Sequence, residues 1–423
     1  MDLLADLEFR GQLYQQTDAE GLRQHLTSPR KVYAGFDPTK DSLTIGNLVQ
    51  ILLLRRFQAA GHTPVVVMGG GTGMIGDPSG KEAERQILTP EQVAANVAGQ
   101  RVSFERLLDF SGPNAAVIVN NADWLSQLGF IEALRDIGKH FSVNMMIQKD
   151  SVRERLHNRD QGISYTEFSY MLLQAYDFSY LLQHHGVTVQ AAGSDQWGNI
   201  VAGVDLIRRT QQREAFGLTT PLVTKADGGK FGKTETGAIW LAAQRTSPYA
   251  FYQFWVNADD ADVPKFLRTF TLFSHDEIRA LEAEHQNNPG ARAAHRALAQ
   301  HMTELLHGAE GVAQAQKATE ALFSGNVAEL SEVGISDLFG SAPTVALEKN
   351  KLAGPGYPVA DLLVDGGVAK SKREAREFLN NRAILINGRT PGAEELIKSD
   401  WLLHGAVLLI RRGKKAWHVT RFR

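Results

Sequence analysis

The stretch between Lys31 and Met68 constrains the fold more than any other part of the sequence. It contains two short apolar runs, 31–36 (KVYAGF) and 64–68 (PVVVM), and between them the segment DSLTIGNLVQILLLRRFQAAG has helical periodicity and closes at Gly61. The run VVVM has no polar face, which is typical of a strand buried on both faces of a parallel sheet. The stretch therefore predicts a βαβ unit. Because helical and strand patterns alternate up to about Val223, we expect an α/β fold with a doubly wound parallel sheet.

The rest of the chain predicts further domains. With 423 residues and 43% hydrophobic content, the chain can bury more than one core. Strand patterns disappear after Gly237 and helical patterns dominate to Phe323, and the stretch that follows is rich in Gly, Pro and Ser. We expect an α/β domain at 1–237, an α-helical domain at 238–324, a linker at 325–354 and a small α+β domain at 355–423.

Charge is distributed unevenly between the body and the C-terminal part. From Lys351 to Arg423 there are 14 Lys and Arg against 7 Asp and Glu, which leaves 31 against 40 of the totals of 45 and 47 for the rest. The basic residues of this part alternate with apolar ones, which predicts a folded basic domain rather than a charged arm. Such a domain suits a nucleic-acid partner.

Composition excludes several classes of protein. The chain has no cysteine, so disulfides, thiolate metal ligands and a cysteine nucleophile are excluded, and the 13 histidines show no metal-ligand spacing. No apolar run approaches the length of a membrane span, and the N-terminus is acidic where a targeting peptide would be basic. We therefore expect a cytoplasmic chain that has neither a membrane span nor a structural metal.

Glycine-rich segments follow both predicted strands of the βαβ unit. GFDPT follows the first strand and leads to a helix that has Gly46 in its first turn, and GGGTGMIGDPSG (69–80) follows the second strand. Ligands bind at the carboxyl edge of a parallel sheet, and the N–H groups at a helix N-terminus attract anions. Each loop taken alone fits a nucleotide site and a plain tight turn equally well.

Polar residues in three later segments extend this candidate site. Tyr170, Gln174 and Asp177 lie on one face of an otherwise apolar helix, which indicates either a ligand pocket or a hydrogen-bonded core network. AAGSDQWGN (191–199) follows another predicted strand. In ADGGKFGKTETG (226–237) two lysines flank Phe-Gly, which fits movable charge for phosphate chemistry as well as solvated surface.

Together these segments resemble the bacterial tyrosyl-tRNA synthetases, a family of class I. GFDPT, GDPSG, GKHFSVN, FSYMLLQAYDF, GSDQWGN and KFGKT occur in the family's order, and LLVDGGVAKSKREAR followed by AILING resembles the RNA-binding domain first known from small-subunit ribosomal protein four. The resemblance implies a Rossmann-like catalytic domain that activates L-tyrosine with ATP to tyrosyl adenylate and pyrophosphate. It also implies transfer of the tyrosyl group to the 3′-terminal adenosine of tRNA(Tyr), a homodimer, Mg²⁺ arriving with ATP, and no protein-bound metal or organic cofactor.

The resemblance assigns roles to residues of this sequence. The positions that match tyrosine contacts are Tyr33, Asp77, Tyr170, Gln174, Asp177 and Gln196, with Tyr33 and Asp177 at the phenol and Gln196 near the carboxylate. Those that match ATP contacts are Gly35, Asp37, Gly46, Asn47, Gly193, Asp195, Lys230, Lys233 and Thr234. The catalytic positions are Thr39, Thr44, Asn47, Lys230 and Lys233, and Lys81 and Arg85 match a mobile charged loop. The expected tRNA contacts are Arg208, Arg209, Lys370, Lys372, Arg373, Arg376, Arg411, Arg412, Lys414 and Lys415.

The sequence departs from the family at four positions, one of which is Ala34, where relatives often have cysteine. Thr44 and Asn47 stand where many relatives have histidines; they keep hydrogen-bonding capacity without charge, so we interpret the site as working. Tyr165 stands where a phenylalanine of the dimer interface is common. Two alternatives stay open. A tryptophanyl enzyme would share the fold but have little use for Tyr33 with Asp177, and a non-catalytic RNA-binding paralogue should have lost the pocket polar groups or the lysine loop.

Overall fold

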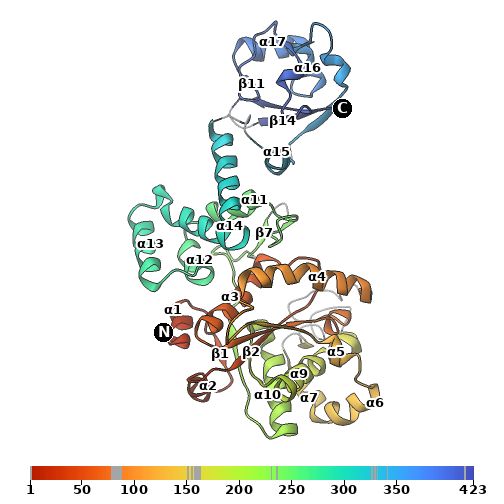
Figure 1. The fold of residues 1–423 in the computed structure, drawn as a ribbon, viewed down its shortest axis with the longest axis vertical. Coiled ribbons are helices and arrows are strands. Elements are labelled where there is room, and N and C mark those ends of the chain that lie inside the picture. Colours follow the sequence, from red (N-terminus) through yellow and green to blue (C-terminus); the bar gives the residue numbers. More distant parts are fainter. Residues whose placement is uncertain are drawn as a thin grey trace. The chain divides into compact units, whose positions relative to one another are not determined.

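The computed structural model of the chain describes most of its length. The described residues are 2–77, 88–149, 152–153, 156, 163–229, 231–234, 237–324, 327, 330, 332–340, 342–413 and 416–423. They belong to two compact units (Figure 1): unit 1 comprises Met1–Thr246 and Trp255–Leu306, and unit 2 comprises Ser247–Phe254 and His307–Arg423. Across the described ranges, no helix combines the length and the apolar character that a bilayer span requires.

Unit 1 is built on a six-stranded sheet. The strands have the order β1-β6-β5-β2-β3-β4, and all neighbours are parallel except β1 and β6. Their bounds are β1 Gln15–Gln16, β2 Lys31–Phe36, β3 Thr63–Met68, β4 Val117–Asn120, β5 Val187–Gly193 and β6 Phe216–Thr220. The chain leaves β2 toward β3 on one side, and β5 pairs with β2 on the other. A doubly wound sheet opens a ligand crevice at such a switch point. The predicted α/β fold with its parallel sheet is confirmed.

Helices cover both faces of this sheet. In Figure 1, α3 and α4 lie on one side of it and α9 and α10 on the other. The helices of this part of unit 1 are α1 Leu3–Phe9, α2 Ala19–His25, α3 Ile45–Ala59, α4 Pro90–Leu107, α5 Ala122–Leu125, α6 Phe130–Glu132, α7 Val143–Gln148, α9 Tyr165–His185 and α10 Trp197–Gln211. The buried side chains of β2, β3 and α9 form one core, in which the rings of Tyr33 and Phe178 are 5.2 Å apart.

Helix α9 carries the polar stripe expected from the sequence. Its N-terminus is capped by Ser164, whose Oγ accepts a hydrogen bond from the backbone N–H of Glu167 at 3.2 Å. The helix ends at Gly186, which adopts a left-handed conformation with φ 68° that a residue with a side chain rarely adopts. The cap and the terminator fix the register that turns Tyr170 and Asp177 toward the sheet.

Buried charge ties the helical part of unit 1 to α1 and α3. This part comprises α12 Val263–Phe270, α13 His275–Asn287 and the segments of α11 Pro248–Val256 and α14 Ala293–Ser324 that belong to unit 1. Arg10 and Arg56 both donate to the backbone carbonyl of Thr271, just beyond the end of α12, at 3.1 and 3.0 Å. The Asp6 carboxylate accepts from Arg10 at 2.9 Å and balances part of this buried charge.

Unit 2 contains a four-stranded sheet with the order β11-β13-β14-β9 and a two-stranded sheet of β10 and β12. Its strands are β9 Thr344–Leu347, β10 Tyr357–Pro358, β11 Ile384–Ile386, β12 Leu396–Ile397, β13 Val407–Arg412 and β14 Ala416–Phe422, and its helices include α15 Glu332–Phe339, α16 Val359–Asp365 and α17 Lys372–Asn380. Leu408 and Ile410 join one core and Val407 and Leu409 another. Because both faces of β13 are covered, its first four residues are apolar without alternation.

The stretch 325–354, which we expect to be a linker, holds regular structure where it is described. It contains α15 and β9, and β9 pairs in parallel with β14 at the edge of the sheet. The Gly, Pro and Ser content of this stretch marks the turns between short elements. The domain limits expected from the sequence stay a prediction.

Candidate active site

The expected site residues of unit 1 surround one cavity. It has a volume of about 710 Å³ and lies where the carboxyl ends of β2 and β5 meet the start of α3. Most of the residues assigned to tyrosine, ATP or catalysis line it: Tyr33, Gly35, Asp37, Thr39, Thr44, Gly46, Asn47, Asp77, Tyr170, Gln174, Asp177, Gly193, Asp195 and Gln196. The structure thus brings together side chains from five separate segments, and their roles toward substrates remain proposals.

A buried carboxylate lies deep in this cavity. Asp177 accepts hydrogen bonds from Asn121 Nδ2 at 2.8 Å and from Trp124 Nε1 at 2.7 Å. The pKa of Asp177 is raised from its ordinary value to about 7, because burial and, to a smaller extent, the charge of Asp37 outweigh the two hydrogen bonds, which lower it. Each carboxylate oxygen keeps capacity to accept a further hydrogen bond.

The Tyr33 hydroxyl is the second polar group in this part of the cavity. Tyr33 is 2% exposed, and its hydroxyl oxygen has no hydrogen-bond partner among the described residues. Burial and the negative charge of Asp177 raise the pKa of this phenol well above its ordinary value, so the group stays protonated. A buried hydroxyl without a partner costs free energy, which a ligand that hydrogen-bonds to it would recover.

A hydrogen-bonded network joins Asp177 to the other polar residues of the cavity. Asn121 also donates to Thr72 Oγ1 at 3.0 Å, and the Thr72 hydroxyl donates to Asp37 Oδ1 at 2.9 Å. The Tyr170 hydroxyl donates to the other oxygen of Asp37 at 3.2 Å. The hydrogen-bonded network of the first alternative is therefore present and forms part of the wall of the cavity, and the ligand pocket of the second alternative stays a prediction.

Sequence reasoning missed three members of this network. Thr72 lies in the glycine-rich loop after β3, and Asn121 and Trp124 lie just after β4. A signal was present, because the segment VIVNNADW places Asn121 and Trp124 at the carboxyl end of an apolar run. That run is shorter than those of β2 and β3, and its residues are only partly buried or exposed.

A second polar cluster lines the same cavity. Gln196 Nε2 donates to Asp77 Oδ2 at 2.6 Å and to Asp195 Oδ2 at 3.2 Å. Asp195 reaches solvent, yet the surrounding protein displaces enough water to raise its pKa, with a further contribution from the charge of Asp77. This cluster combines two acidic groups with an amide, which suits a ligand that carries an ammonium group.

Thr44 and Asn47, which stand in place of histidines, are bonded to each other at the start of α3. The backbone N–H and the hydroxyl of Thr44 both donate to Asn47 Oδ1, at 3.0 and 2.9 Å. The hydroxyl proton of Thr44 is therefore donated to Asn47. Asn47 Nδ2 has no partner among the described side chains and backbone, which leaves it as the donor available at this helix N-terminus.

Some expected residues fall outside what can be placed. Lys81, Arg85, Lys230, Lys414 and Lys415 lie outside the described residues. Lys233 and Thr234 form the short strand β7, and only their backbone is described; β7 pairs with β8 Gly237–Ala238. The charged groups expected to handle the phosphates of ATP therefore remain a prediction from the sequence.

The residues expected to bind tRNA are mostly exposed. On α10, Arg208 and Arg209 both pair with Asp205, at 2.7 and 2.6 Å. In unit 2, exposed cations lie on α17, just before it and at the end of β13: Lys370, Lys372, Arg373, Arg376 and Arg412. Lys372 pairs with Asp361 at 2.7 Å, and the partly buried Arg411 lies over the Trp417 ring at 5.5 Å.

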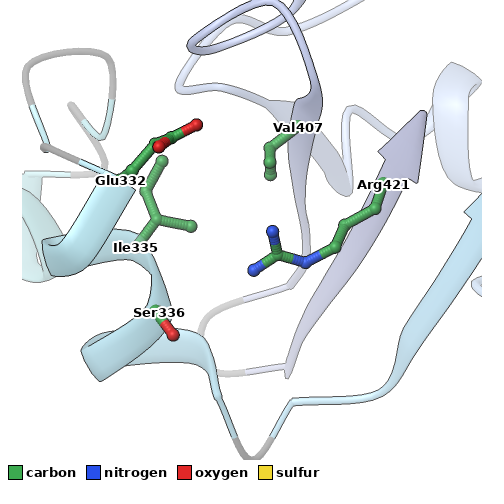
Figure 2. Close-up of a pocket in the computed structure, with 5 residues that line it drawn as sticks. All are labelled: Glu332, Ile335, Ser336, Val407 and Arg421. Atoms are coloured by element: carbon green, nitrogen blue, oxygen red, sulfur yellow. The ribbon is translucent and has the colours of Figure 1, made fainter. Parts of the chain in front are cut away.

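Unit 2 also has a small cavity of about 260 Å³. Figure 2 shows Glu332 and Ile335 of α15 on one side and, on the other, Arg421 of β14 together with Val407, its partner on β13. None of the motif residues lines it. In the part of the chain that the structure describes, no three histidine or acidic side chains gather as a metal site.

Comparison with known proteins relates this geometry to a family. Residues 25–324 match the family model for class I tRNA synthetases of the tryptophan and tyrosine type, and residues 334–420 match the C-terminal domain model for tyrosine–tRNA ligases. The tyrosine–tRNA ligase of Bacillus caldotenax is 51% identical over the whole of both chains, and that of Roseiflexus castenholzii is 49% identical over 99% of each.

A solved structure agrees with these sequence relations. The C-terminally truncated mitochondrial tyrosyl-tRNA synthetase of Aspergillus nidulans superimposes with a TM-score of 0.68 at 28% identity, over 76% of this chain and 94% of that one. The family model covers strands β2 to β6 of the sheet, the cavity and the helical part of unit 1, and the full-length relatives extend the match through unit 2. The chain therefore belongs to the tyrosine–tRNA ligases, a family of class I tRNA synthetases.

Proposed function

We propose that the cavity of unit 1 binds L-tyrosine and ATP, forms tyrosyl adenylate and pyrophosphate, and then passes the tyrosyl group to the 3′-terminal adenosine of tRNA(Tyr). The observation that carries the proposal is the pair of buried polar groups on Asp177 and Tyr33. A phenol hydroxyl can donate to the carboxylate and accept from the Tyr33 hydroxyl at the same time. Phenylalanine would leave both groups buried without a new partner, which costs free energy.

Selection against phenylalanine follows from this arrangement. A site built to hydrogen-bond a substrate hydroxyl rejects the analogue that lacks it, and tyrosyl-tRNA synthetases are themselves the usual example of this rule. The Asp177 carboxylate is held by Asn121 and Trp124, so it cannot turn away from an apolar ring. No separate editing site is needed for a tyrosine enzyme of this kind.

The rest of the amino acid fits the second polar cluster. The α-ammonium group would lie against Asp77, Tyr170 and Gln174, and Gln196 would donate to the α-carboxylate. The 2.6 Å bond from Gln196 to Asp77 supports this placement, because it brings a donor for the carboxylate next to an acceptor for the ammonium group.

Activation requires charge stabilisation more than proton transfer. The tyrosine carboxylate is already ionised and attacks the α-phosphorus of ATP, so that pyrophosphate leaves without a general base. We assign the adenosine side to Gly35, Asp37, Gly46, Gly193 and Asp195. The phosphates would be held by Thr39, Thr44, Asn47, Lys230, Lys233 and Thr234, with Lys81 and Arg85 adding positive charge and Mg²⁺ entering with ATP.

The exposed cations of unit 2 would bind the tRNA backbone. Lys370, Arg373 and Arg376 are exposed on or beside α17, and solvated Lys and Arg side chains suit phosphate contacts that are insensitive to base sequence. Arg208 and Arg209 are candidates for the acceptor end, where contact with phosphate would compete with their ion pairs to Asp205. A cytoplasmic location, where tRNA and ATP meet, is part of the proposal.

A homodimer is supported by an apolar surface of unit 1. Large apolar side chains are exposed on α6, α7 and the first residue of α9: Phe130, Ile131, Val143, Met145 and Tyr165, with exposed fractions of 57–73%. Exposed apolar side chains of this size, where they gather in one patch, are typical of protein contact surfaces. Met145→Asp should shift the protein to monomer in size-exclusion chromatography with light scattering. Val102→Asp, at an equally exposed apolar position on α4, should leave the mass unchanged.

Titration calorimetry tests the amino-acid part of this proposal. L-tyrosine, L-phenylalanine and L-tryptophan are each titrated into the full chain, and tRNA charging with labelled tyrosine is measured on the same preparation. We expect binding of tyrosine alone, followed by charging. Binding of tryptophan at equal strength would support the tryptophanyl alternative, and folded protein that binds none of the three would overturn the proposal.

A further inference from the structure

A chain of hydrogen bonds runs from Lys149 to the acidic end of the cavity. Lys149 Nζ donates to Asn199 Oδ1 at 2.5 Å, and Asn199 Nδ2 donates to Gln196 Oε1 at 2.7 Å. Gln196 Nε2 then donates to Asp77 and Asp195. Asn199 is fully buried at the start of α10, so water cannot replace these bonds. Lys149 lies at the end of α7 and belongs to none of the expected site residues.

The groups at the two ends of this series of hydrogen bonds fix the orientation of the Asn199 and Gln196 amide groups between them. A lysine ammonium group can only donate, so Asn199 must turn its oxygen toward Lys149 and its NH₂ toward Gln196. Gln196 must then receive that bond on its oxygen, which leaves its NH₂ facing the cavity. At the other end two carboxylates, which can only accept, demand the same orientation. A reversed Gln196 would point its oxygen at Asp77 and Asp195.

The Lys149 side chain is closely packed against its surroundings. The stem of Lys149 runs over Gly198, where an added Cβ would lie 3.1 Å from Lys149 Cε and 3.2 Å from Cγ. Desolvation lowers the pKa of Lys149, and the charges of Asp77 and Asp195 raise it in opposition. A half-buried ammonium group is costly unless it is hydrogen-bonded and its charge is balanced; Asn199 accepts its hydrogen bond, and the charges of Asp77 and Asp195 favour its charged form.

We propose that Lys149 is a positioning residue that acts through Asn199 to keep the Gln196 NH₂ group facing the α-carboxylate of bound tyrosine. This rests on the proposed function. When the ammonium group of the substrate engages Asp77, that carboxylate no longer needs Gln196, and one N–H becomes available to the substrate carboxylate. Lys149 then keeps the Asn199 and Gln196 amide groups in this orientation while the substrate carboxylate approaches Gln196.

A comparison of two ligands tests the proposal on the full chain. L-tyrosine and tyramine share the phenol and the ammonium group, but tyramine has no carboxylate. In Lys149→Met we expect the dissociation constant of L-tyrosine to rise roughly tenfold to hundredfold, the range for a lost hydrogen bond to a charged group, while that of tyramine stays the same. Lys149→Arg should restore most of the tyrosine affinity. Lys139→Met, at an exposed lysine ten residues earlier, should bind both ligands as the wild type does.

A second variant separates the hydrogen-bond chain from the charge of Lys149. Asn199→Leu keeps the lysine but removes the bridge, so it should weaken L-tyrosine as much as Lys149→Met does and spare tyramine. Wild-type affinity for L-tyrosine in either variant would overturn the proposal. Equal weakening of both ligands, or a lowered unfolding midpoint that accounts for the loss, would also overturn it in favour of a structural role. Failure of the wild type to bind L-tyrosine would instead refute the proposed function.

Discussion

The cavity of unit 1 and the basic surface of α17 in unit 2 present polar groups in opposite ways. In the cavity, Asp177 is buried and accepts two hydrogen bonds from fixed side chains, and the Tyr33 hydroxyl is buried with no partner among the described residues. On α17, Arg373 and Arg376 are exposed, and neither forms an ion pair with another described residue. Under the proposed function, the cavity would distinguish one hydroxyl group, whereas the surface would attract a repeated negative charge.

This difference teaches where single residues matter. Removal of one partner from a buried network leaves other groups unsatisfied, so its effect is large and depends on the shape of the ligand. Removal of one exposed cation weakens a sum of similar contacts and depends on salt. The substitutions below should fall into these two classes.

Asp177→Asn should have the largest effect. The new amide group must direct its NH₂ toward Asn121 or Trp124, both of which are donors, so one donor loses its acceptor and the phenol loses its charged partner. We expect tyrosine-dependent exchange of pyrophosphate into ATP to fall by roughly a hundredfold or more. An Asp177→Asn enzyme with unchanged preference for tyrosine over phenylalanine would remove Asp177 from the specificity site.

Tyr33→Phe should have a smaller effect that differs between binding and stability. Because the hydroxyl has no partner in the part of the chain that the structure describes, its loss should leave the denaturant midpoint unchanged or slightly raised. The preference for tyrosine over phenylalanine should fall by about tenfold, as expected for one hydrogen bond. A clear loss of stability would show that the hydroxyl already has a partner in the free protein.

Titration of Asp177 should affect stability and tyrosine affinity in opposite directions as pH rises. Its pKa is raised to about 7 in the folded protein, so the folded state holds this proton more tightly than the unfolded chain, and stability falls as pH rises from about 4 to about 7. Tyrosine affinity should rise severalfold through pH 7, because the ionised carboxylate is the stronger acceptor. Calorimetric titrations at pH 6 and 8 measure the affinity. Asp177→Asn serves as the control and should lack both trends.

Substitution of single exposed cations should have the smallest effects. Arg376→Ala should lower the tRNA affinity about twofold to fivefold and reduce the salt dependence of binding by about one phosphate contact, with pyrophosphate exchange unchanged. Arg279→Ala, at an exposed arginine on α13, provides the matched control. A loss of pyrophosphate exchange in Arg376→Ala would contradict the separation of amino-acid activation in the cavity from tRNA binding on α17.

A small amount of stability should also depend on Asp6. Hydrogen bonds and charge from His275, Arg10 and Arg56 outweigh burial and lower the pKa of Asp6, so its contribution is present above the unfolded pKa and is lost as pH falls below it. Unfolding midpoints between pH 3 and 6 should therefore drop less in Asp6→Asn than in the wild type. Parallel pH curves for the two proteins would exclude this contribution.

The sequence predicts the parts of the fold that depend on local pattern. The β2–α3–β3 unit is confirmed because apolar runs, helical periodicity and a terminal glycine agree there. The position of Asp177 on one face with Tyr170 follows from helical spacing alone. These features need no knowledge of distant residues.

What the sequence does not predict depends on contacts between distant segments. Lys149 and Asn199 are 50 positions apart, and nothing local indicates that the lysine reaches the amide. The Thr44 hydroxyl is used by Asn47, a pairing that residue types alone cannot distinguish from two free donors. Similarly, β9 lies in a stretch with the composition of a linker. It forms a strand through its pairing with β14, which the local composition does not indicate.

The most direct test of the account is exchange of labelled pyrophosphate into ATP by the wild-type chain without tRNA, with tyrosine, phenylalanine and tryptophan compared at equal concentration. We predict exchange that depends on tyrosine alone, since only its phenol satisfies both Tyr33 and Asp177. Exchange with phenylalanine or tryptophan at a similar rate, or none with any amino acid from folded protein, would contradict the account.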